Sequence, residues 1–541
     1  MNNTQTTPQC LSTGLNAIKN AKQNAAAPMI RLSSRQAHGS RISQERRALL
    51  PKLSARRGTS DIKAILSEDP TDSEYLTDNH VDRAMLTWSD SVCDTVDDGR
   101  CSVLTQALYR DRTEPEFLQT VHEIMVSTES LLMENPKYFD VFQRMIEPER
   151  VITFRVPWVD DNGRTHVNRG FRVQMSSTLG PYKGGLRFHP TVNLSILKFL
   201  AFEQLFKNAL TGVSLGAGKG GADFDPKGKS DTEVMRFCQS FMTELCKHIG
   251  PGVDVPAGDI GVGGREIGYL YGQYKRLTGR FEGALTGKGP TWGGSHIRPE
   301  ATGYGAVYFS EHMMRGAGHV KGLEGMRAAI SGSGNVAQFA AEKLLDLGAT
   351  PMTFSDSGGT LYCETGFTRD HLALIQDLKN NKRGRLSAIA DVPEFTYLPE
   401  STPWGMSCDV AFPCATQNEL KAEDAQNLVA NGCMAVVEGA NMPTTPEAYQ
   451  CLKESGVLFG PAKAANAGGV GVSGLEMAQN SGGLSWTREE VDSQLKDMMK
   501  NIYDETSAAA LRVGQPNDLR TGADVAAFLR VADAMIDQGC V

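Results

Sequence analysis

The sequence contains no run of 18 apolar residues, so no segment predicts a membrane-spanning helix. It also lacks an excess of basic residues, and its formal net charge of −8 disfavours nucleic acid as a partner. None of its 11 cysteines forms a CxxC pair or a Cys/His group with zinc-binding spacing. These absences predict a soluble intracellular protein with reduced thiols, no metal site and no membrane or nucleic-acid partner.

The chain is long enough for two large domains, with 541 residues of which 40% are hydrophobic. Its first 60 residues differ from the rest, because ten of them are Lys or Arg and only Glu45 is acidic. A basic, serine-rich segment of this kind cannot bury enough apolar surface to fold alone, and it is also typical of organelle transit peptides. A transit peptide and a disordered tail are therefore both open interpretations of this extension, and folded sequence is predicted to begin near Thr77.

Periodicity predicts an α/β fold beyond this extension. Apolar residues at helical spacing predict helices over 115–132 and 194–210. Alternating residues predict strands over 151–156 and 170–175, with a turn between them at 160–163.

Three lysines and one aspartate are the strongest candidates for a reactive site. Lys219 lies in the sequence GAGKGGADFD, a glycine-rich segment expected to be a loop that a small substrate can approach closely. Lys183 and Asp259 also lie beside glycines, and Lys207 shares a helical face with Gln204. This set predicts a pocket for a small dianion, because each of two carboxylates needs its own charge-assisted partner.

A phosphate-binding P-loop, G-x-x-x-x-G-K-[ST], is the alternative interpretation of the segment around Lys219. It is disfavoured because Val213 stands where the first glycine is required. Gly220 also replaces the Ser or Thr that would hold magnesium. An ordinary loop lysine at Lys219 and a turn residue at Asp259 remain the simplest alternatives to a reactive pair.

A second motif predicts a dinucleotide-binding domain. The sequence GSGNVA at 332–337 lies between a predicted strand over 326–331 and an alanine-rich helix that ends near Leu347. This arrangement is the G-x-G-x-x-A fingerprint, in which glycines let a pyrophosphate approach a helix N-terminus. A second strand ends at Asp356, where a ribose-binding acid is expected. Together with a pKa-lowered Lys219 acting as a base and Asp259 moving a proton, these residues predict hydride transfer.

From about residue 105 to the C-terminus the chain resembles the Glu/Leu/Phe/Val dehydrogenase family, and within it the small hexameric glutamate dehydrogenases of the NADP-dependent type. The segments that carry this resemblance are GPYKGGLRFHP (180–190), GKGGADFDPKGK (218–229), VPAGDIGVGGRE (255–266), RPEATGYG (298–305), SGSGNVAQ (331–338), PCATQNEL (413–420), EGANMPTT (438–445) and KAANAGGVGVSGLEMAQN (463–480).

The resemblance implies a reversible reaction in which 2-oxoglutarate, ammonia and NAD(P)H give L-glutamate and NAD(P)⁺. The catalytic residues that it implies are Lys219 and Asp259. The substrate-binding residues that it implies are Lys183 and Ser473 for the side-chain carboxylate, Gln204 and Lys207 for the α-carboxylate, and the backbone of Gly258. The implied cofactor-binding residues are Thr302, Gly332, Ser333, Gly334 and Asn335.

The choice between NADP and NAD depends on the segment around Asp356. An acid at this position ordinarily binds the ribose of NAD and repels a 2′-phosphate. Basic and hydroxyl side chains nearby could neutralise that phosphate, although a charge cluster is usually just a solvated helix end. The residues assigned to this phosphate are Ser357, Lys379, Lys382 and Arg385. The resemblance decides for NADP, with NAD as the alternative.

The resemblance also implies the architecture: an N-terminal α/β substrate domain plus a Rossmann-like dinucleotide-binding domain, in a homohexamer. The expected boundaries are 1–77 for the extension, 78–290 for the substrate domain, 291–517 for the dinucleotide domain and 518–541 for a C-terminal helix that returns to the substrate domain. The compartment is expected to be the cytoplasm, or a mitochondrion or plastid if the extension is a transit peptide. Two other functions stay open, a dehydrogenase acting on leucine, valine or phenylalanine, and a non-catalytic nucleotide sensor.

Overall fold

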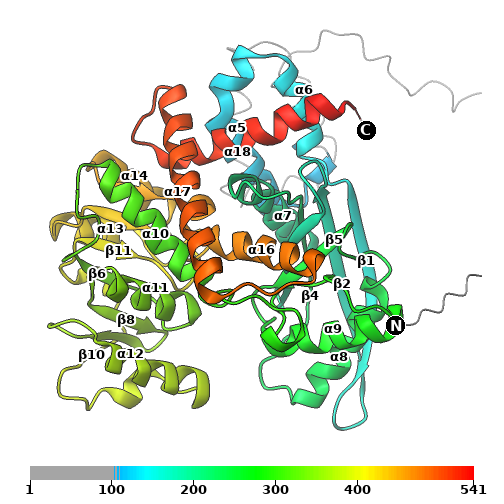
Figure 1. The fold of residues 1–541 in the computed structure, drawn as a ribbon, viewed down its shortest axis with the longest axis horizontal. Coiled ribbons are helices and arrows are strands. Elements are labelled where there is room, and N and C mark those ends of the chain that lie inside the picture. The colour runs from blue at the N-terminus through cyan, green and yellow to red at the C-terminus, as the bar shows by residue number, and fades with distance from the viewer. Residues whose placement is uncertain (1–102, 104–106, 109, 541) are drawn as a thin grey trace, which may run out of the picture. The chain divides into compact units, whose positions relative to one another are not determined.

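The computed structural model describes residues 103, 107, 108 and 110–540, so the predicted N-terminal extension lies outside the described residues. The described chain contains two five-stranded sheets with helices on their faces, one mixed and one wholly parallel (Figure 1). This arrangement confirms the predicted α/β fold class.

The elements follow the predicted order along the chain. The helices are α5 (Pro115–Glu134), α6 (Lys137–Met145), α7 (Leu194–Leu210), α8 (Asp231–Leu245), α9 (Gly264–Thr278), α10 (Ala301–Gly316), α11 (Asn335–Asp346), α12 (Arg369–Gln376), α13 (Ala422–Ala430), α14 (Pro446–Glu454), α15 (Ala462–Ala465), α16 (Gly468–Gly482), α17 (Arg488–Arg512) and α18 (Leu519–Gln538). The strands are β1 (Arg150–Val159), β2 (Thr165–Ser176), β3 (Tyr182–Phe188), β4 (Ala217–Ala222), β5 (Asp254–Gly258), β6 (Arg327–Ile330), β7 (Thr350–Pro351), β8 (Thr353–Asp356), β9 (Gly359–Tyr362), β10 (Thr396–Pro399), β11 (Val410–Phe412), β12 (Ala435–Val437) and β13 (Leu458–Gly460). Short helical turns are η2 (Pro290–Trp292), η3 (Asp377–Asn381), η4 (Leu386–Ile389) and η5 (Pro403–Gly405).

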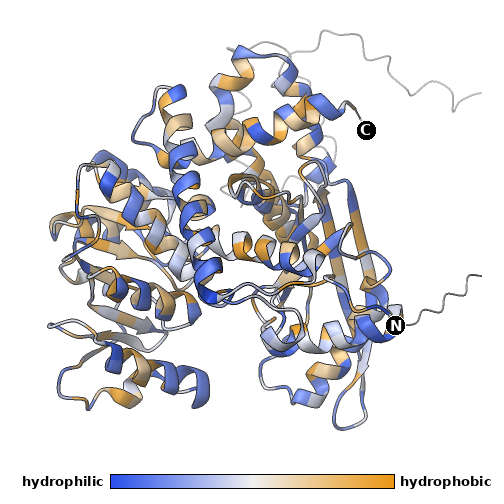
Figure 2. Cartoon of the chain, in the orientation of Figure 1, coloured by the Kyte–Doolittle hydropathy of each residue, from blue (hydrophilic) through white to orange (hydrophobic). Residues whose placement is uncertain are grey.

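The first sheet has the strand order β1-β2-β4-β3-β5. Strands β1, β2 and β4 pair antiparallel, whereas β3 runs parallel to both β4 and β5. Helix α7 packs on one face, and α8 and α9 pack against the sheet through a separate apolar cluster. Burial on both faces explains why the central strands are almost continuously buried. Figure 2 colours much of α7, which covers one face of this sheet, as hydrophobic.

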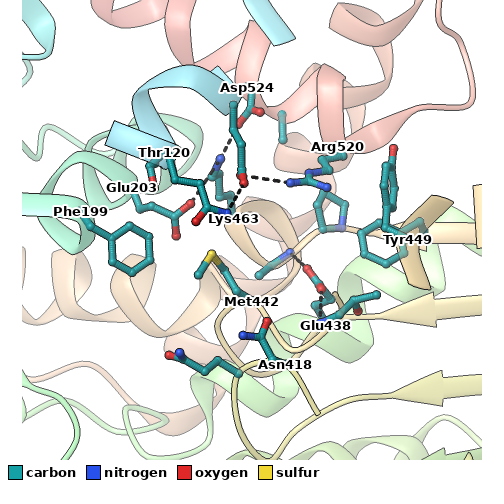
Figure 3. A pocket seen from close by; sticks show the side chains of 18 of the residues that line it. Thr120, Phe199, Glu203, Asn418, Glu438, Met442, Tyr449, Lys463, Arg520 and Asp524 are labelled. Atoms are coloured by element: carbon teal, nitrogen blue, oxygen red, sulfur yellow. Dashed lines mark hydrogen bonds and ion pairs between the residues drawn. The ribbon is translucent and has the colours of Figure 1, made fainter. Parts of the chain in front are cut away.

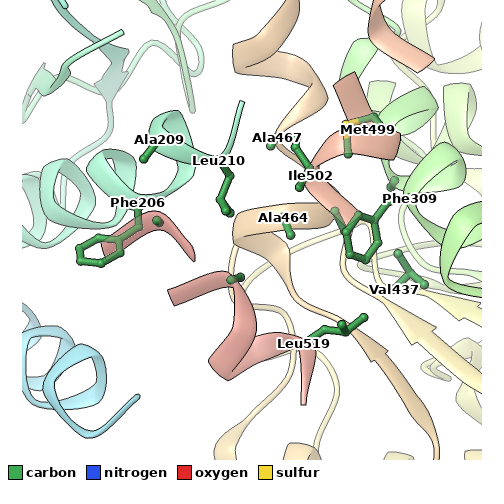
Figure 4. Close-up of a cluster of buried hydrophobic side chains, with 14 of the residues drawn as sticks. Phe206, Ala209, Leu210, Phe309, Val437, Ala464, Ala467, Met499, Ile502 and Leu519 are labelled. Atoms are coloured by element: carbon green, nitrogen blue, oxygen red, sulfur yellow. The ribbon is translucent and has the colours of Figure 1, made fainter. Parts of the chain in front are cut away.

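Helix α7 begins where the sequence predicts. The side chain of Asn193 accepts a hydrogen bond from the backbone N–H of Ile196, which caps the first turn. The far end of α7 joins a large apolar cluster to which α10, α15, α17 and α18 also contribute (Figure 4). Because α7 is held between this cluster and the sheet, polar groups along it are fixed in position.

The second sheet is parallel, with the strand order β13-β12-β11-β6-β7. Strand β6 lies between β7, the next strand along the chain, and β11, which follows much later, so the order reverses beside β6. In sheets of this kind ligands bind at such a reversal, outside the carboxyl ends of the strands. The GSGNVA turn lies at this point, between β6 and α11.

The last helix, α18, packs against α5, α6 and α7. Tyr138 donates a hydrogen bond to Asp533 over 3.1 Å, and its ring meets Phe528 edge-on at 5.4 Å. The guanidinium of Arg530 also donates to the backbone oxygen of Gly212, just beyond α7. The end of the chain thus contacts the first helices of the described fold.

A fully buried ion pair holds the centre of the first sheet. Arg172 of β2 donates from Nε to Asp254 of β5 over 2.9 Å, and both side chains are completely inaccessible to solvent. Gln174 donates to the same carboxylate over 2.9 Å, and Arg172 also reaches the backbone oxygen of Gly184 in β3. Removal of either partner would leave the other as an unpaired buried charge that water cannot reach, which strongly destabilises the fold.

We expect Asp254→Asn to destabilise the protein by about 3–5 kcal/mol, because Arg172 would then be a buried charge without its counter-ion. The urea midpoint of unfolding, followed by circular dichroism, measures the loss. The matched control is Asp504→Asn, which breaks the exposed Lys500–Asp504 pair and should cost less than about 1 kcal/mol. Equal shifts in the two variants would contradict this account of the buried pair.

Candidate active site

A pocket of about 500 Å³ is lined by residues of β3, β4 and β5 and by residues of α7, α10 and α16. Its lining includes five cationic side chains and a single acidic one, so the pocket favours an anionic occupant. The five are Lys183, Arg187, Lys207, Lys219 and Arg298, and the acid is Asp259.

Lys219 lies on a strand, not on the loop that its glycine neighbours predict. Its segment is β4, which pairs with β2 on one side and β3 on the other. The glycines permit close packing of neighbouring strands: a Cβ at Gly184 in β3 would come within 1.8 Å of the backbone oxygen of Gly218. The loop prediction was wrong because glycine here provides close approach between strands and not a turn.

Lys219 and Asp259 meet at the centre of the pocket. The Lys219 Nζ lies 3.4 Å from Asp259 Oδ2, and Arg187 donates from Nε to the same oxygen over 2.8 Å. Asp259 follows directly after β5, whose last residue, Gly258, also lines the pocket. The predicted lysine and aspartate are therefore in contact, with an arginine that the prediction did not include.

Burial shifts the acidity of both groups. Desolvation lowers the pKa of Lys219, although the neighbouring Asp259 carboxylate acts in the opposite direction. Burial acts to raise the pKa of Asp259, but the charges of Lys219 and Arg187 outweigh it and hold that pKa below its ordinary value. The pair is thus a lysine that gives up its proton more easily than usual beside a carboxylate that stays ionised.

Lys207 and Gln204 lie on the face of α7 that lines the same pocket. The Lys207 Nζ lies 3.4 Å from Asn441 Oδ1, and Gln204 donates to Asn208 on its own helix over 2.7 Å. Burial, followed by the charge of nearby Lys219, lowers the pKa of Lys207 to about 8.

Lys183, Ser473 and Arg298 also line this pocket. Lys183 is only 1% exposed and donates to Thr286 Oγ1 over 2.8 Å, a neutral partner. Arg298 donates from Nε to Ser473 Oγ over 2.8 Å. Burial and the charge of Arg298 hold the pKa of Lys183 well below its ordinary value, which a bound anion would relieve.

The pocket also contains an unused hydrogen-bond acceptor. Asn466 is 2% exposed, and among the residues that the structure describes none donates a hydrogen bond to its Oδ1. Its Nδ2 donates to the backbone oxygen of Ala440 over 3.0 Å, which fixes the orientation of the amide. An unpaired buried acceptor of this kind costs free energy.

The dinucleotide motif has the predicted strand-turn-helix form. Gly332 has φ of +84°, a conformation that favours glycine. Within the described chain, no atom lies within 4 Å of the position that a Cβ at Gly334 would take. Helix α11 begins at Asn335, and Thr302 lies in the first turn of α10, where it lines the charged pocket. The open backbone at Gly334 and the free N–H groups of α11 suit a phosphate-bearing cofactor.

Comparison with known proteins agrees with this geometry. The family profile described as Glutamate/Leucine/Phenylalanine/Valine dehydrogenase matches residues 293–539, and the dimerisation domain of the Glu/Leu/Phe/Val dehydrogenases matches residues 148–276. The chain belongs to this family. It is 59% identical to the NADP-specific glutamate dehydrogenase of Giardia intestinalis over 436 residues, which cover 80% of this chain and 97% of that protein.

Two further relatives are also named glutamate dehydrogenase. The NADP-specific glutamate dehydrogenase of Escherichia coli is 54% identical over 81% of this chain and 98% of its own. The crystal structure of Plasmodium falciparum glutamate dehydrogenase superposes with a TM-score of 0.80 at 53% identity, over 81% of this chain and 94% of that one.

Two residues that line the charged pocket, Arg187 and Arg298, were absent from the sequence prediction. Arg187 follows Lys183 and Gly185 at a spacing of two along β3, so strand alternation places it on the same face. Arg298 stands four residues before Thr302, but it precedes α10 and carries no helical spacing to reveal it. Arg187 could have been predicted from the alternation of the strand, whereas Arg298 could be recognised only from the three-dimensional structure.

The acid after the second strand of the nucleotide motif is already paired. Asp356 accepts hydrogen bonds from the backbone N–H groups of Gly358 and Leu386, both at 2.9 Å, and its carboxylate lies 3.6 Å from Lys379. Arg385 hydrogen-bonds to Ser357, whereas Lys382 pairs with Asp377 and is 66% exposed. Asp356 is thus neutralised, and Ser357 and Arg385 lie together beside it.

The same described residues contain no group of three or more His, Cys, Asp or Glu side chains that could hold a metal ion. Nor does any helix within them have the length and apolar character needed to cross a membrane.

We expect the affinity of the pocket for a dicarboxylate to fall as the pH rises through about 8, because Lys207 titrates there. Its charge is present below this pH and is lost above it. Calorimetry with glutarate between pH 6.5 and 9.5 measures the effect, which should approach about tenfold. Lys207→Arg, which stays charged, should remove the alkaline loss, and an unchanged pH profile in this variant would contradict the assignment.

Proposed function

We propose that the chain is an NADP-dependent glutamate dehydrogenase, which catalyses the reversible reductive amination of 2-oxoglutarate with ammonia to L-glutamate. The observation that carries the proposal is the contact between Lys219 and Asp259 in a pocket that presents cations on several walls. Two carboxylates and a reactive carbon between them match this distribution of charge. The names of the relatives, at more than 50% identity over most of the chain, support it.

The substrate-binding roles follow from the positions of the cations. Lys207 and Gln204 on α7 bind the α-carboxylate of the substrate. Lys183 and Ser473 bind the side-chain carboxylate, and Arg298 holds the Ser473 hydroxyl in position. The backbone oxygen of Gly258 lines the space between the two ends, where the keto carbon lies.

The chemistry at the keto carbon is assigned to Lys219 and Asp259. Lys219 hydrogen-bonds to the keto oxygen and stabilises the charge that develops there as ammonia attacks the carbon. Asp259, kept ionised by Lys219 and Arg187, carries two protons in turn from the substrate nitrogen to the oxygen, which leaves as water. NADPH, when bound, would supply the hydride that reduces the resulting imine, and the imine nitrogen takes up a proton that comes from solvent.

NADP is the cofactor that the residues around Asp356 support. A free carboxylate would repel the 2′-phosphate, but Asp356 is held by two backbone N–H groups and Lys379. Ser357 and Arg385 are the groups that would receive the phosphate, and Lys382 contributes charge from a greater distance. Gly332, Ser333, Gly334 and Asn335 would hold the pyrophosphate, with Thr302 on the side of the charged pocket.

The domain boundaries belong to the same proposal. The substrate domain spans 78–290, the dinucleotide domain spans 291–517, and the helix in 518–541 completes the substrate domain, as its contacts with α5, α6 and α7 support. We infer a homohexamer and an intracellular location, in the cytoplasm or, if residues 1–77 direct import, in a mitochondrion or plastid.

The alternative substrates are the apolar amino acids named in the family description. Lys183 argues against them, because an apolar side chain would leave its ammonium group buried without a counter-ion.

The test is the initial rate of nicotinamide oxidation in the presence of ammonium chloride, with NADPH or NADH crossed against 2-oxoglutarate or 4-methyl-2-oxopentanoate. We expect rapid oxidation only with NADPH and 2-oxoglutarate. Preference for the branched oxoacid would overturn the dicarboxylate assignment, and preference for NADH would overturn the phosphate site.

Two variants serve as controls for this assay. Lys219→Ala and Asp259→Ala should each lower kcat by about three orders of magnitude or more, because each removes a group that acts at the reacting carbon. NADPH binding, followed by its fluorescence, should persist in both. Turnover close to that of the unchanged protein in either variant would refute the catalytic assignment.

The phosphate site has its own test. Lys382→Glu combined with Arg385→Glu should weaken NADPH binding by about 10- to 100-fold, because charge-assisted hydrogen bonds to phosphate are replaced by repulsion. NADH affinity, measured in the same titration, provides the control and should change little. Unchanged NADPH affinity would show that the basic cluster does not hold the phosphate.

A further inference from the structure

A second cavity, of about 280 Å³, opens beside α5, α7 and α18 and is separate from the charged pocket (Figure 3). We call it the acidic cavity because five of its lining side chains are carboxylates and only two are cationic. The carboxylates are those of Glu116, Glu123, Glu203, Glu438 and Asp524, and the cations are Lys463 and Arg520. Its rim is solvent-exposed at Gln119 and Asn418, so small cations from solvent are drawn into it.

A small cavity of about 30 Å³ lies between the acidic cavity and the charged pocket. It shares Glu203, Ala462 and Lys463 with the acidic cavity. It shares Gln204, Lys207, Lys219 and Asn441 with the charged pocket. Leu200 completes its wall. A space of this size holds one molecule as small as water. The three cavities are therefore adjacent, and a path through them from the acidic cavity would end at Lys219; we call this path the passage.

Glu203 is the acidic group at the narrow part of this passage. Lys463 lies between Glu203, at 3.5 Å, and Asp524, at 2.8 Å, and Figure 3 shows the three side chains converging. Burial raises the pKa of Glu203, while Lys463 opposes the shift. The carboxylate of Glu203 is therefore a better proton acceptor than that of an exposed glutamate.

The charged pocket is a poor entrance for ammonium. Its lining carries five cations against one acid, which attracts a dicarboxylate but repels a small cation. Neutral ammonia is not repelled and is close to water in size.

We propose that the acidic cavity and the small cavity form a separate entry route for ammonia, which rests on the proposed function and supplies its nitrogen substrate. Ammonium enters the acidic cavity and gives a proton to the Glu203 carboxylate. The N–H bond breaks and its electron pair stays on nitrogen, which makes ammonia the nucleophile. Ammonia then passes Ala462 and Leu200 to the carbon beside Lys219, and the proton on Glu203 returns to water in the acidic cavity.

The simpler alternative is that the ion pairs of Lys463 with Glu203 and Asp524 only hold neighbouring helices together. Lys463 links α15 to Glu203 on α7 and to Asp524 on α18, which ties three elements together. A purely structural network predicts that changes here alter stability, or all kinetic constants together. An entry route predicts a selective effect on one substrate.

Ala462→Leu and Leu200→Phe narrow the passage without touching the charged side chains. We expect each to raise the KM for ammonium by about tenfold while the KM values for 2-oxoglutarate and NADPH stay within about twofold. Glu203→Gln, which keeps the size of the side chain, should raise the KM for ammonium similarly. Leu511→Phe is the matched control for Leu200→Phe, because Leu511 is solvent-exposed and lines none of the three cavities, and it should leave all three KM values unchanged.

The assay uses the full chain with ammonium chloride as the varied substrate, and thermal unfolding shows that each variant is folded. An unchanged KM for ammonium in the folded variants, or an equal rise in all three KM values, would overturn the entry route. If Ala462→Leu does not fold, Glu203→Gln decides by the same criteria. Absence of ammonium-dependent NADPH oxidation in the unchanged protein would instead overturn the proposed function itself.

Discussion

The constraint on which the site depends is the burial of several like charges around one carboxylate. Lys183 and Lys219 are buried and Lys207 is partly buried, and among the described residues Asp259 is the only acid that lines their pocket. Burial of a charge costs free energy unless a partner is supplied. The positive charges of the pocket therefore exceed what Asp259 can balance, and a dianion that balances them also stabilises the folded chain by mass action. The shifted pKa values of the lysines express the same imbalance.

The first sheet makes this crowding possible. Its glycines let β3, β4 and β5 approach one another closely, so that lysines from two strands and the acid after a third share one pocket. Two other features hold these strands in place. Arg172 and Asp254 join β2 to β5 out of reach of solvent, and α7 is fixed between the sheet and a large apolar cluster. The glycine-rich strands that carry the site are therefore held in position by the buried ion pair and by the packing of α7.

Much of this was predictable from the sequence, and the failures have physical reasons. The bounds of α7 follow from the helical spacing of its apolar residues, which reflects burial of one face. The turn between β1 and β2 follows from the turn-forming residues that lie between two alternating segments. Strand β4 was missed because its glycine composition signals a turn when read locally, whereas the close approach of β2 and β3 is non-local. Arg298 was missed for a similar reason, since its contact with Ser473 joins residues 175 positions apart. The pairing of Asp356 with Lys379 likewise depends on how β9, α12 and η3 fold back toward β8, which the sequence does not reveal.

The contacts of α18 have a consequence for how the chain is made. The helix that covers Tyr138 and Phe142 is synthesised long after them, because its residue Asp533 lies 395 positions beyond Tyr138. Until α18 is made, the parts of α5 and α6 that it covers stay exposed, although α7 and the first sheet can already pack together. During that interval these aromatic side chains are open to aggregation or to binding by a chaperone.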